Sequence, residues 1–408
     1  MIGGIHCVGR ILAMMVCLSA PAFAQEESAT DTRADQIQAE RMEKQAVLRP
    51  EELTPGEKQL TRIKHTTERL LQGNVHLQLG GLQSGSGFAL GPVVQWSNST
   101  DFVRADFSSV GSLSQFYRVG AGLTFPKFGT RSLSLSLQTS HSDAPQINYY
   151  GSGPNSLKGN RTDYRQENTV GELSLRWAPW RHHIIMKAEG GEVLVNVGPG
   201  TRPDVTSTEL RYGPHEAPGI DLQTNFLRGS ASLELDGRDS VGDPHKGGRL
   251  ALQYQHYWDL KRSTYSFSRM SGDAQAFVPF FNRKRVIALR ARVDLTHPDP
   301  NQTIPFYLQP ILGEAGDFRG FRPYRYRGNN LLLLNAEYRW EVSSGFDMAL
   351  FADSGRVFDK ARQMNLSHLK SSAGFGFRFK NRDAVVMRID TGFSREGWQS
   401  WVRFGNVF

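Results

Sequence analysis

The sequence predicts an all-β protein, a transmembrane antiparallel β-barrel of about 16 strands of the bacterial outer-membrane type. Three observations lead to this fold class. The chain begins with a secretory signal, so it is exported. From residue 74 onward, segments of alternating apolar and polar residues recur between clusters of Gly, Asn, Asp, Ser and Pro. No later stretch has the ~18 to 20 consecutive apolar residues of a spanning helix, which leaves a closed barrel as the way to pair every backbone group in hydrocarbon.

Residues 1–24 form the predicted signal peptide. Arg10 is its basic region, residues 11–18 are its short apolar run, and residues 22–24, Ala-Phe-Ala, are its cleavage site. Both cysteines of the chain, Cys7 and Cys17, lie inside this segment. The exported protein would therefore contain no disulfide, no thiolate nucleophile and no cysteine-based metal site.

The remaining chain divides into a polar lead, residues 25–73, and the predicted barrel, residues 74–408. The lead is charged and poor in aromatic side chains, so we expect a flexible or loosely helical periplasmic segment, with a partner-binding helix as the alternative. The formal net charge of +8 raises the question of nucleic acid, but the basic residues are spread over alternating segments rather than gathered in a run. A charged lumen or a surface against anionic lipid explains them better, and outer-membrane lipids are an expected partner.

The alternation gives sixteen candidate strands. They span residues 74–82, 88–97, 101–109, 115–125, 132–141, 167–178, 183–195, 228–237, 248–258, 271–281, 285–296, 330–342, 346–357, 371–380, 384–393 and 398–408. The long connections 142–166, 196–227 and 298–329 all follow odd-numbered strands, and the stretch 238–247 is the one long connection after an even-numbered strand. Outer-membrane barrels have short periplasmic turns and long outer loops, so both termini are predicted to be periplasmic.

The last strand ends in an aromatic residue, Phe408, after Val402 and Phe404. This pattern resembles the carboxy-terminal signal by which bacterial barrel proteins are recognised for membrane insertion. Asn406 departs from it, because an apolar or aromatic residue is usual at that position. We predict that Phe404 and Phe408 serve as an insertion signal.

Two acids are predicted to face the lumen from neighbouring strands. Between residues 330 and 342, the even-numbered side chains from Leu332 to Trp340 form an apolar face with an aromatic end, as expected of a lipid-facing stripe. Glu337 lies on the opposite face, because successive side chains of a strand alternate. Asp353 occupies the inward face of the next strand.

Two inward acids in a confined space repel each other unless a cation lies between them. The tripeptide Arg319-Gly320-Phe321, in the preceding loop, can supply one. Arginine can donate to two carboxylates at once, glycine allows a tight bend, and phenylalanine can wedge into the wall. The alternative is that Arg319 is a solvated loop residue and the acids line a water-filled pore.

At these residues the sequence resembles the bacterial surface antigen superfamily of BamA and TamA, sixteen-stranded outer-membrane barrels. In that family the sixth outer loop carries an R-G-F/Y tip that contacts acids on the twelfth and thirteenth strands. The resemblance assigns a structural lock of loop six to Arg319, Gly320, Phe321, Glu337, Asp353 and Gly355. It implies a role in inserting or translocating proteins or lipids at the outer membrane, with a weak seam between the first and last strands.

Two further stretches carry the resemblance. Residues 236–247 contain a D-x-R-D…P-x-x-G hairpin, and residues 150–164 resemble a stretch common in shorter members. Full members also carry periplasmic POTRA modules, which residues 25–73 are too short to hold. The resemblance therefore implies a short member without POTRA domains, whose partners would be unfolded outer-membrane client proteins or a separately encoded periplasmic protein.

No motif of the sequence predicts an enzyme, a cofactor site or a metal site. A G-x-S-x-G nucleophile elbow is absent. The pair His182-His183 lies at a short periplasmic turn without metal-ligand spacing, and His141 has only neighbouring serines to form a catalytic pair. The alternative to insertion or translocation is a passive pore or a structural barrel, which would keep the strands without requiring the lock.

Overall fold

The computed structural model describes residues 74–408, except residues 81, 181–182, 282–283, 314–315, 344, 381–383 and 406–407. The chain divides into two units, Met1–Gln72 and Gly73–Phe408, and the description that follows concerns the second. The predicted signal peptide, residues 1–24, and the predicted lead, residues 25–73, lie outside the described residues. These two boundaries remain predictions.

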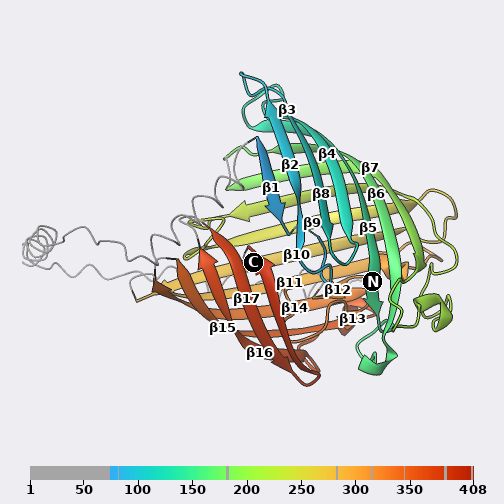
Figure 1. The fold of residues 1–408 in the computed structure, drawn as a ribbon. Coiled ribbons are helices and arrows are strands. Elements are labelled where there is room, and N and C mark those ends of the chain that lie inside the picture. The colour runs from blue at the N-terminus through green and yellow to red at the C-terminus, as the bar shows by residue number, and fades with distance from the viewer. Residues whose placement is uncertain are drawn as a thin grey trace, which may run out of the picture. The chain divides into compact units, whose positions relative to one another are not determined.

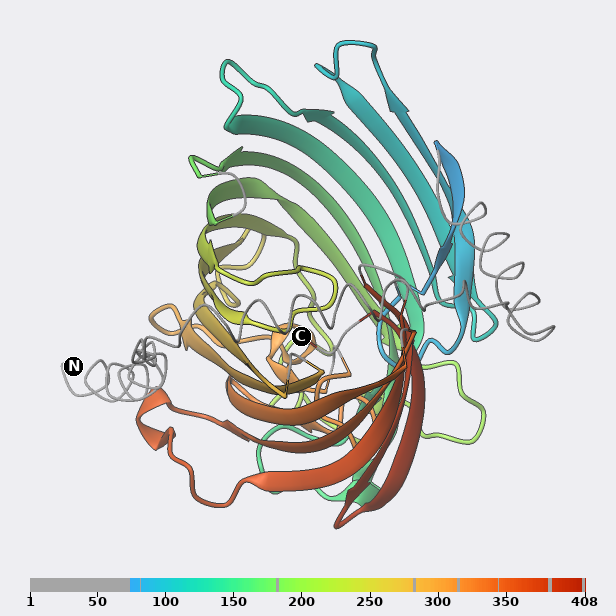
Figure 2. The same ribbon diagram turned by 90° about the vertical axis from the view of Figure 1, so that its left-hand side faces the viewer.

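Sixteen strands form one antiparallel sheet in which sequence neighbours pair, apart from one long loop that carries two short strands of its own (Figures 1 and 2). The strands of the large sheet are β1 Val75–Leu79, β2 Ala89–Ser97, β3 Arg104–Ser112, β4 Tyr117–Phe125, β5 Leu133–Tyr149, β6 Thr162–Trp177, β7 Ile184–Pro199, β8 Phe226–Asp236, β9 Gly247–Asp259, β10 Phe267–Phe280, β11 Arg285–Pro298, β14 Asn330–Ser343, β15 Phe346–Phe358, β16 Lys370–Lys380, β17 Val385–Ser394 and β18 Gly397–Phe404. The predicted fold class and strand count are confirmed. None of the described helices is long and apolar enough to cross a membrane.

The two faces of the wall follow the predicted alternation. In β14, Glu337 and its inward neighbours on either side are buried, whereas Leu334, Ala336, Tyr338 and Trp340 are partly exposed on the outer face. Leu332 departs from the prediction, because it is buried at the outer end of the same stripe. The alternation therefore places polar and charged side chains in the lumen and apolar side chains towards lipid.

Strands β5, β6 and β7 are longer than predicted. Residues 142–149 were expected in a loop, yet they continue β5 and pair with β6 across a register shift between Ala144 and Ile147. Beyond this bulge the lumen face is carried by odd-numbered residues, and Ile147 and Tyr149 are buried. The alternation of leucine and serine ends at residue 140. Because this alternation was the pattern that predicted the strand, its extension to residue 149 was not predicted.

The sheet has two edges, β1 and β18, and the pairings of the described residues include no ladder between them. Contacts at this seam come from the connection that follows β1. A Cβ at Gly80 would lie 3.1 Å from the ring of Phe404, and Arg403 donates to the Ser84 hydroxyl at 2.9 Å. The barrel is nearly closed, and side chains rather than backbone pairs join its two ends.

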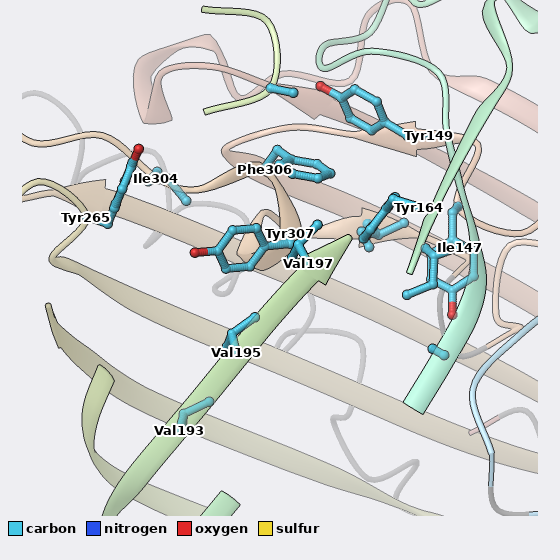
Figure 3. Packing of buried hydrophobic residues seen from close by; sticks show 14 of the residues in the cluster. Ile147, Tyr149, Tyr164, Val193, Val195, Val197, Tyr265, Ile304, Phe306 and Tyr307 are labelled. Carbon is cyan, nitrogen blue, oxygen red and sulfur yellow. The ribbon is translucent and has the colours of Figure 1, made fainter. Parts of the chain in front are cut away.

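Long loops fill the outer part of the lumen. Residues 299–329, called loop six here, contain the 3-10 helix η4 Phe306–Leu308 and the two-stranded sheet of β12 Ile311–Leu312 and β13 Tyr326–Arg327. An apolar cluster gathers Phe306 and Tyr307 of this loop with Tyr149, Tyr164 and valines of β7 (Figure 3). This packing explains why the loop lies inside the barrel, since its aromatic side chains are removed from water there.

Candidate functional site: the clamp of loop six

Arg319 lies at the centre of a buried charge cluster, and only 1% of its surface is exposed. Its Nε and Nη2 donate to the two carboxylate oxygens of Asp353 at 2.8 and 2.6 Å, and its backbone N–H donates to the same carboxylate at 3.0 Å. Its Nη1 donates to Glu337. The guanidinium also lies 3.5 Å from the ring centroid of Phe351. One arginine therefore joins the two acids that the sequence predicted to face the lumen.

Further charged side chains surround this centre. Glu337 accepts from Arg339 at 2.7 Å and from Arg378 at 3.0 Å. Asp390 of β17 accepts from Arg378 at 2.7 Å and lies 3.9 Å from the Arg319 guanidinium. A fourth arginine, Arg388, also donates to Asp390, at 3.0 Å. We call Arg319, Arg339, Arg378, Arg388, Glu337, Asp353 and Asp390 the clamp.

The clamp keeps Arg319 charged. Burial alone would lower the pKa of this guanidinium, but Asp353 and Glu337 outweigh burial and raise the pKa above its ordinary value. Glu337 in turn has three guanidinium partners. Such buried pairs are costly to break singly, because the remaining charge is left without compensation.

Gly320 allows the loop to lie directly on the wall. Its φ is +83°, a conformation that glycine adopts without strain, and a Cβ there would lie 2.8 Å from the Cβ of Ser372. Ser372 of β16 donates to the carbonyl of Arg319, and Ser394 of β17 donates to the carbonyl of Gly320 at 2.7 Å. The tight bend predicted for this glycine is present.

Phe321 and Gly355 complete the predicted lock. The ring of Phe321 stacks on Phe318 with centroids 4.5 Å apart, inside a small apolar cluster that includes Leu312 and Leu333. A Cβ at Gly355 would lie 2.8 Å from the side chain of Leu312, so the glycine makes room for β12. All six predicted lock residues therefore lie in one buried region.

Loop six has a second anchor at its outer end. Arg327 is fully buried, donates to the Tyr164 hydroxyl at 2.7 Å and to the Phe306 carbonyl, and lies 5.4 to 5.6 Å from the rings of Tyr149, Tyr164 and Phe306. Gly153 N–H donates to the Arg327 carbonyl at 2.6 Å. The stretch 150–164, which the sequence singled out, is thus the docking surface for β13.

Neighbouring Arg325 extends this anchor to the far side of the seam. Its Nε donates to both carboxylate oxygens of Glu396, in the turn between β17 and β18, at 2.9 Å. Its Nη2 donates to the Ser156 carbonyl at 2.7 Å. Loop six therefore bridges the last hairpin and the outer end of the β5–β6 hairpin.

The turn between β8 and β9, residues 237–246, reaches a distant part of the wall. Asp243 accepts from Lys380 of β16 at 3.0 Å, and Lys380 also pairs with Asp347 of β15 at 2.7 Å. The Gly242 carbonyl accepts from the Val385 N–H of β17 at 3.3 Å. We call this turn the strap, because it ties strands eight and nine to the thirteenth, fourteenth and fifteenth strands of the barrel.

The two aromatic residues of the predicted insertion signal lie on different sides of the wall. Phe404 ends β18 on the outer face and contacts Phe88, with ring centroids 6.2 Å apart. Phe408 lies against Phe277, and the Arg339 guanidinium is 5.3 Å from its ring centroid. The signalling role remains a prediction, and Phe408 has a structural contact beside the clamp.

Most of this chain matches one protein family. The model of the Omp85 superfamily domain matches residues 111–393, which is more than half of the chain. The chain belongs to the Omp85 superfamily. Its members are outer-membrane barrels that insert or translocate proteins, so this Omp85 chain is an outer-membrane barrel of that class. No curated protein sequence matches it.

Two solved structures resemble the Omp85 barrel in fold. BamA from Haemophilus ducreyi lacking POTRA domains 1–3 superposes with a TM-score of 0.58 and 13% identity, over 82% of this chain and 69% of that chain. CdiB from Acinetobacter baumannii gives a TM-score of 0.50 and 13% identity, over 81% of this chain and 59% of that chain. The predicted absence of POTRA domains concerns residues outside the described part and stays a prediction.

Two histidines that the sequence analysis considered, His141 and His183, have structural contacts in the described part of the chain. His141 contacts Thr169 at 2.8 Å and Tyr117 at 3.3 Å on the outer face, whereas the serines beside it point to the opposite face. His183 contacts the Asp236 carbonyl at 2.8 Å. In the described part of the chain, no group of His, Cys, Asp or Glu could hold a metal ion.

Sequence reasoning missed six side chains of the clamp and its anchors. Arg339, Arg378, Arg388 and Asp390 lie on inward positions of β14, β16 and β17, and Arg325 and Arg327 lie in the loop. Charged residues at inward positions of a strand beside the lock were the available signal. Their partners depend on how the strands curve around the lumen, which alternation alone does not give.

Proposed function

We propose that this Omp85 barrel inserts or translocates polypeptides at the outer membrane by opening between β1 and β18. The observation that carries the proposal is the contrast between an unpaired seam and a closed lumen. Loop six occupies part of the lumen and is held there by the clamp and by the second anchor, so a route along the barrel axis is obstructed. The edge strands, in contrast, offer backbone groups that a client strand can pair with.

The ion pairs and hydrogen bonds between distant strands are distributed unevenly around the barrel, which favours motion of the strands on one side of the seam. Strands β8 to β18 are braced by the clamp, by the strap and by the contact of Phe408 with Phe277. Strands β1 to β7 join this braced part through the backbone pairing of β7 with β8 and through loops, where Arg327 meets Tyr164 and Arg325 meets Ser156. On this proposal the braced side stays fixed and the strands before β7 bend away from the seam about the β7–β8 pairing.

We further propose that both termini are periplasmic and that clients reach the seam from that side. The longest connections of the described chain follow odd-numbered strands, as outer loops do in barrels that begin in the periplasm, and the strap after the eighth strand is the exception. Outer-membrane lipids, unfolded client proteins and a separately encoded periplasmic protein are the proposed partners. The chain is proposed to act without enzymatic chemistry.

A disulfide across the seam tests the proposal. A Cβ at Gly80 lies 3.8 Å from the Cβ of Phe404, which is close to the ~3.8 Å typical of disulfides. Cells in which Gly80→Cys/Phe404→Cys replaces the wild-type chain should lose client proteins from the outer membrane under oxidising conditions and regain them on reduction. The two native cysteines lie in the predicted signal peptide, so no other cysteine of the exported chain should compete for the engineered disulfide.

A second disulfide, within the wall, controls for cross-linking. The reduced seam variant controls for the two substitutions, because Gly80 has a positive φ and Phe404 belongs to the predicted insertion signal. Ser354 and Ser371 lie on neighbouring strands with hydroxyls 2.9 Å apart on the exposed face, so Ser354→Cys/Ser371→Cys adds a cross-link without closing the seam. This control should keep a wild-type outer-membrane proteome. An unchanged proteome with the seam fully cross-linked would show that the seam does not open during function.

A passive pore is the second candidate, and polar cavities on the lumen side of the wall favour it. One cavity of about 410 Å³ is lined by Lys187, Glu234, Arg249 and Asp273 among others. Conductance in planar bilayers separates the two functions. A large, steady conductance supports the pore, whereas small, flickering conductance supports a plugged barrel that opens at its seam.

A further inference from the structure

Three arginines gather on the outer loops without a carboxylate partner of their own. Arg161 precedes β6, Arg202 follows β7, and Arg322 lies in loop six. All three are partly exposed, and none forms an ion pair among the described residues. Arg161 and Arg202 meet at Asn148, which faces away from the buried lumen residues Ile147 and Tyr149 on the same strand. The carbonyl of Pro323, next to Arg322, accepts from the Asn148 amide at 3.4 Å.

Two of these arginines share one neutral acceptor. Arg161 Nε and Arg202 Nη1 donate to the same side-chain oxygen of Asn148, at 3.0 and 2.6 Å. The other side-chain bonds of Arg202 go to Gln146, at 3.2 Å to its side-chain oxygen and at 3.3 Å to its carbonyl. Two like charges are therefore brought together by amide and carbonyl oxygens, which carry no compensating charge.

The nearest acids compensate only in part. Asp163 accepts from the Arg202 backbone N–H at 3.2 Å with Oδ2, whereas its buried Oδ1 has no hydrogen-bond partner. Burial lowers the pKa of Arg202, the charge of Arg161 lowers it further, and Asp163 and Asp204 oppose them without restoring the ordinary value. The charged form of Arg202 is thus disfavoured by its own surroundings.

The hydroxyl of Tyr150 is the second buried polar group at this place. Tyr150 is 1% exposed, and its hydroxyl lies beside the Arg322 guanidinium without a well-formed hydrogen bond. Burial raises the pKa of this hydroxyl, while Arg161 and Arg322 lie close enough to lower it. A donor hydroxyl and three cations therefore lie in one region whose nearby acids, Asp163 and Asp204, form no ion pair with them among the described residues.

We propose that Arg161, Arg202 and Arg322, with the hydroxyl of Tyr150, form a binding site for a phosphate group at the outer surface. Phosphate fits because its several acceptor oxygens can receive paired donors from two planar guanidinium groups. Such a group occurs both free in the medium and on phosphorylated lipid headgroups of the outer leaflet. The site is separate from the clamp and from the seam.

Titration of the purified full chain in an uncharged detergent tests the site. Inorganic phosphate, diphosphorylated lipid A and dephosphorylated lipid A are added in separate arms, and binding is followed by isothermal calorimetry and by the unfolding temperature. The wild-type chain should bind the phosphorylated lipid and be stabilised by it, and the dephosphorylated lipid should give neither effect. Binding of inorganic phosphate as well would assign the site to the phosphate group itself, whereas binding of the lipid alone would assign it to the headgroup.

Two variants make the result specific. Arg161→Gln/Arg202→Gln should weaken phosphate-dependent binding at least tenfold, because glutamine keeps the hydrogen bonds available but removes both charges. Arg356→Gln is the control, since Arg356 is another partly exposed arginine bonded to neutral groups, Asn365 and the Ser367 carbonyl. Absence of binding to the wild-type chain, or equal weakening in the control, would overturn the proposal.

Discussion

Replacing Arg319 with alanine removes the central cation of the clamp. The variant loses two side-chain bonds to Asp353, of 2.8 and 2.6 Å, and one to Glu337. The two acids are affected unequally. Glu337 keeps Arg339 and Arg378, whereas Asp353 loses its guanidinium and keeps only the Asn335 amide at 2.8 Å and a backbone N–H. The expected destabilisation therefore comes mainly from Asp353.

The charge count sets the size of the effect. Breaking a buried ion pair by removing one partner costs about 3–5 kcal/mol. The wild-type clamp holds four arginines against three acids, and the variant holds three against three, so no net charge is added. We expect the lower end of the range, about 3 kcal/mol, which is roughly a hundredfold change in the unfolding equilibrium.

Urea unfolding in lipid vesicles, followed by tryptophan fluorescence, measures this loss. The heat-modifiable gel shift and the protease resistance of loop six should weaken in parallel. The double variant Arg319→Ala/Asp353→Asn should lose at least ~2 kcal/mol less unfolding free energy than the sum of the losses of the two single variants, because it leaves no unpaired carboxylate at residue 353. Additive single changes, or a variant with wild-type unfolding and an intact loop, would refute the clamp as the source of stability.

Three further substitutions test other contacts in the same unfolding and proteolysis assays. Gly320→Ala should destabilise by about 2 kcal/mol through its positive φ and its approach to Ser372, whereas Gly129→Ala, at positive φ in open space, should show only the smaller backbone effect. Arg327→Met should be tolerated better than Arg319→Met by about 2 kcal/mol, because no acid is left behind; an equal loss would contradict this reasoning. Lys380→Ala should expose the strap to protease and speed hydrogen exchange at Val385, and Lys246→Ala, in the same strap, should do neither.

Sequence reasoning predicted the strands and the lock because both depend on local patterns. The period of two in segments such as 330–342 gives the strand and its inward face together, so Glu337 and Asp353 could be assigned to the lumen. Predicting that Arg319 pairs with these acids required the family resemblance as well. Two inward acids indicate that a cation lies between them, but the alternation does not identify which residue supplies it.

The remaining contacts connect parts of the wall that are far apart in the sequence. The strap was noted only as an unusually long turn, because its partners Lys380 and Val385 follow it by more than a hundred residues. Arg327 was not predicted, because its partners are aromatic rings, a hydroxyl and a carbonyl. No acidic partner in the sequence indicated that this arginine is buried. The extension of β5 was missed because residues 142–149 lack the lipid-facing alternation.

The clamp also bears on the order in which this barrel forms. The bonds from Arg319 to Glu337 and Asp353 close loops of 18 and 34 residues, and the bond from the Gly320 carbonyl to Ser394 closes one of 74. Joining the two edges at Arg403 and Ser84 closes a loop of 319 residues. Shorter loops cost less entropy and form faster, so the carboxy-terminal third can fold as a nucleus before the amino-terminal strands are added. The seam is then the last part of the barrel to form. A folding intermediate that lacks only the seam therefore resembles a folded barrel that has opened at its seam.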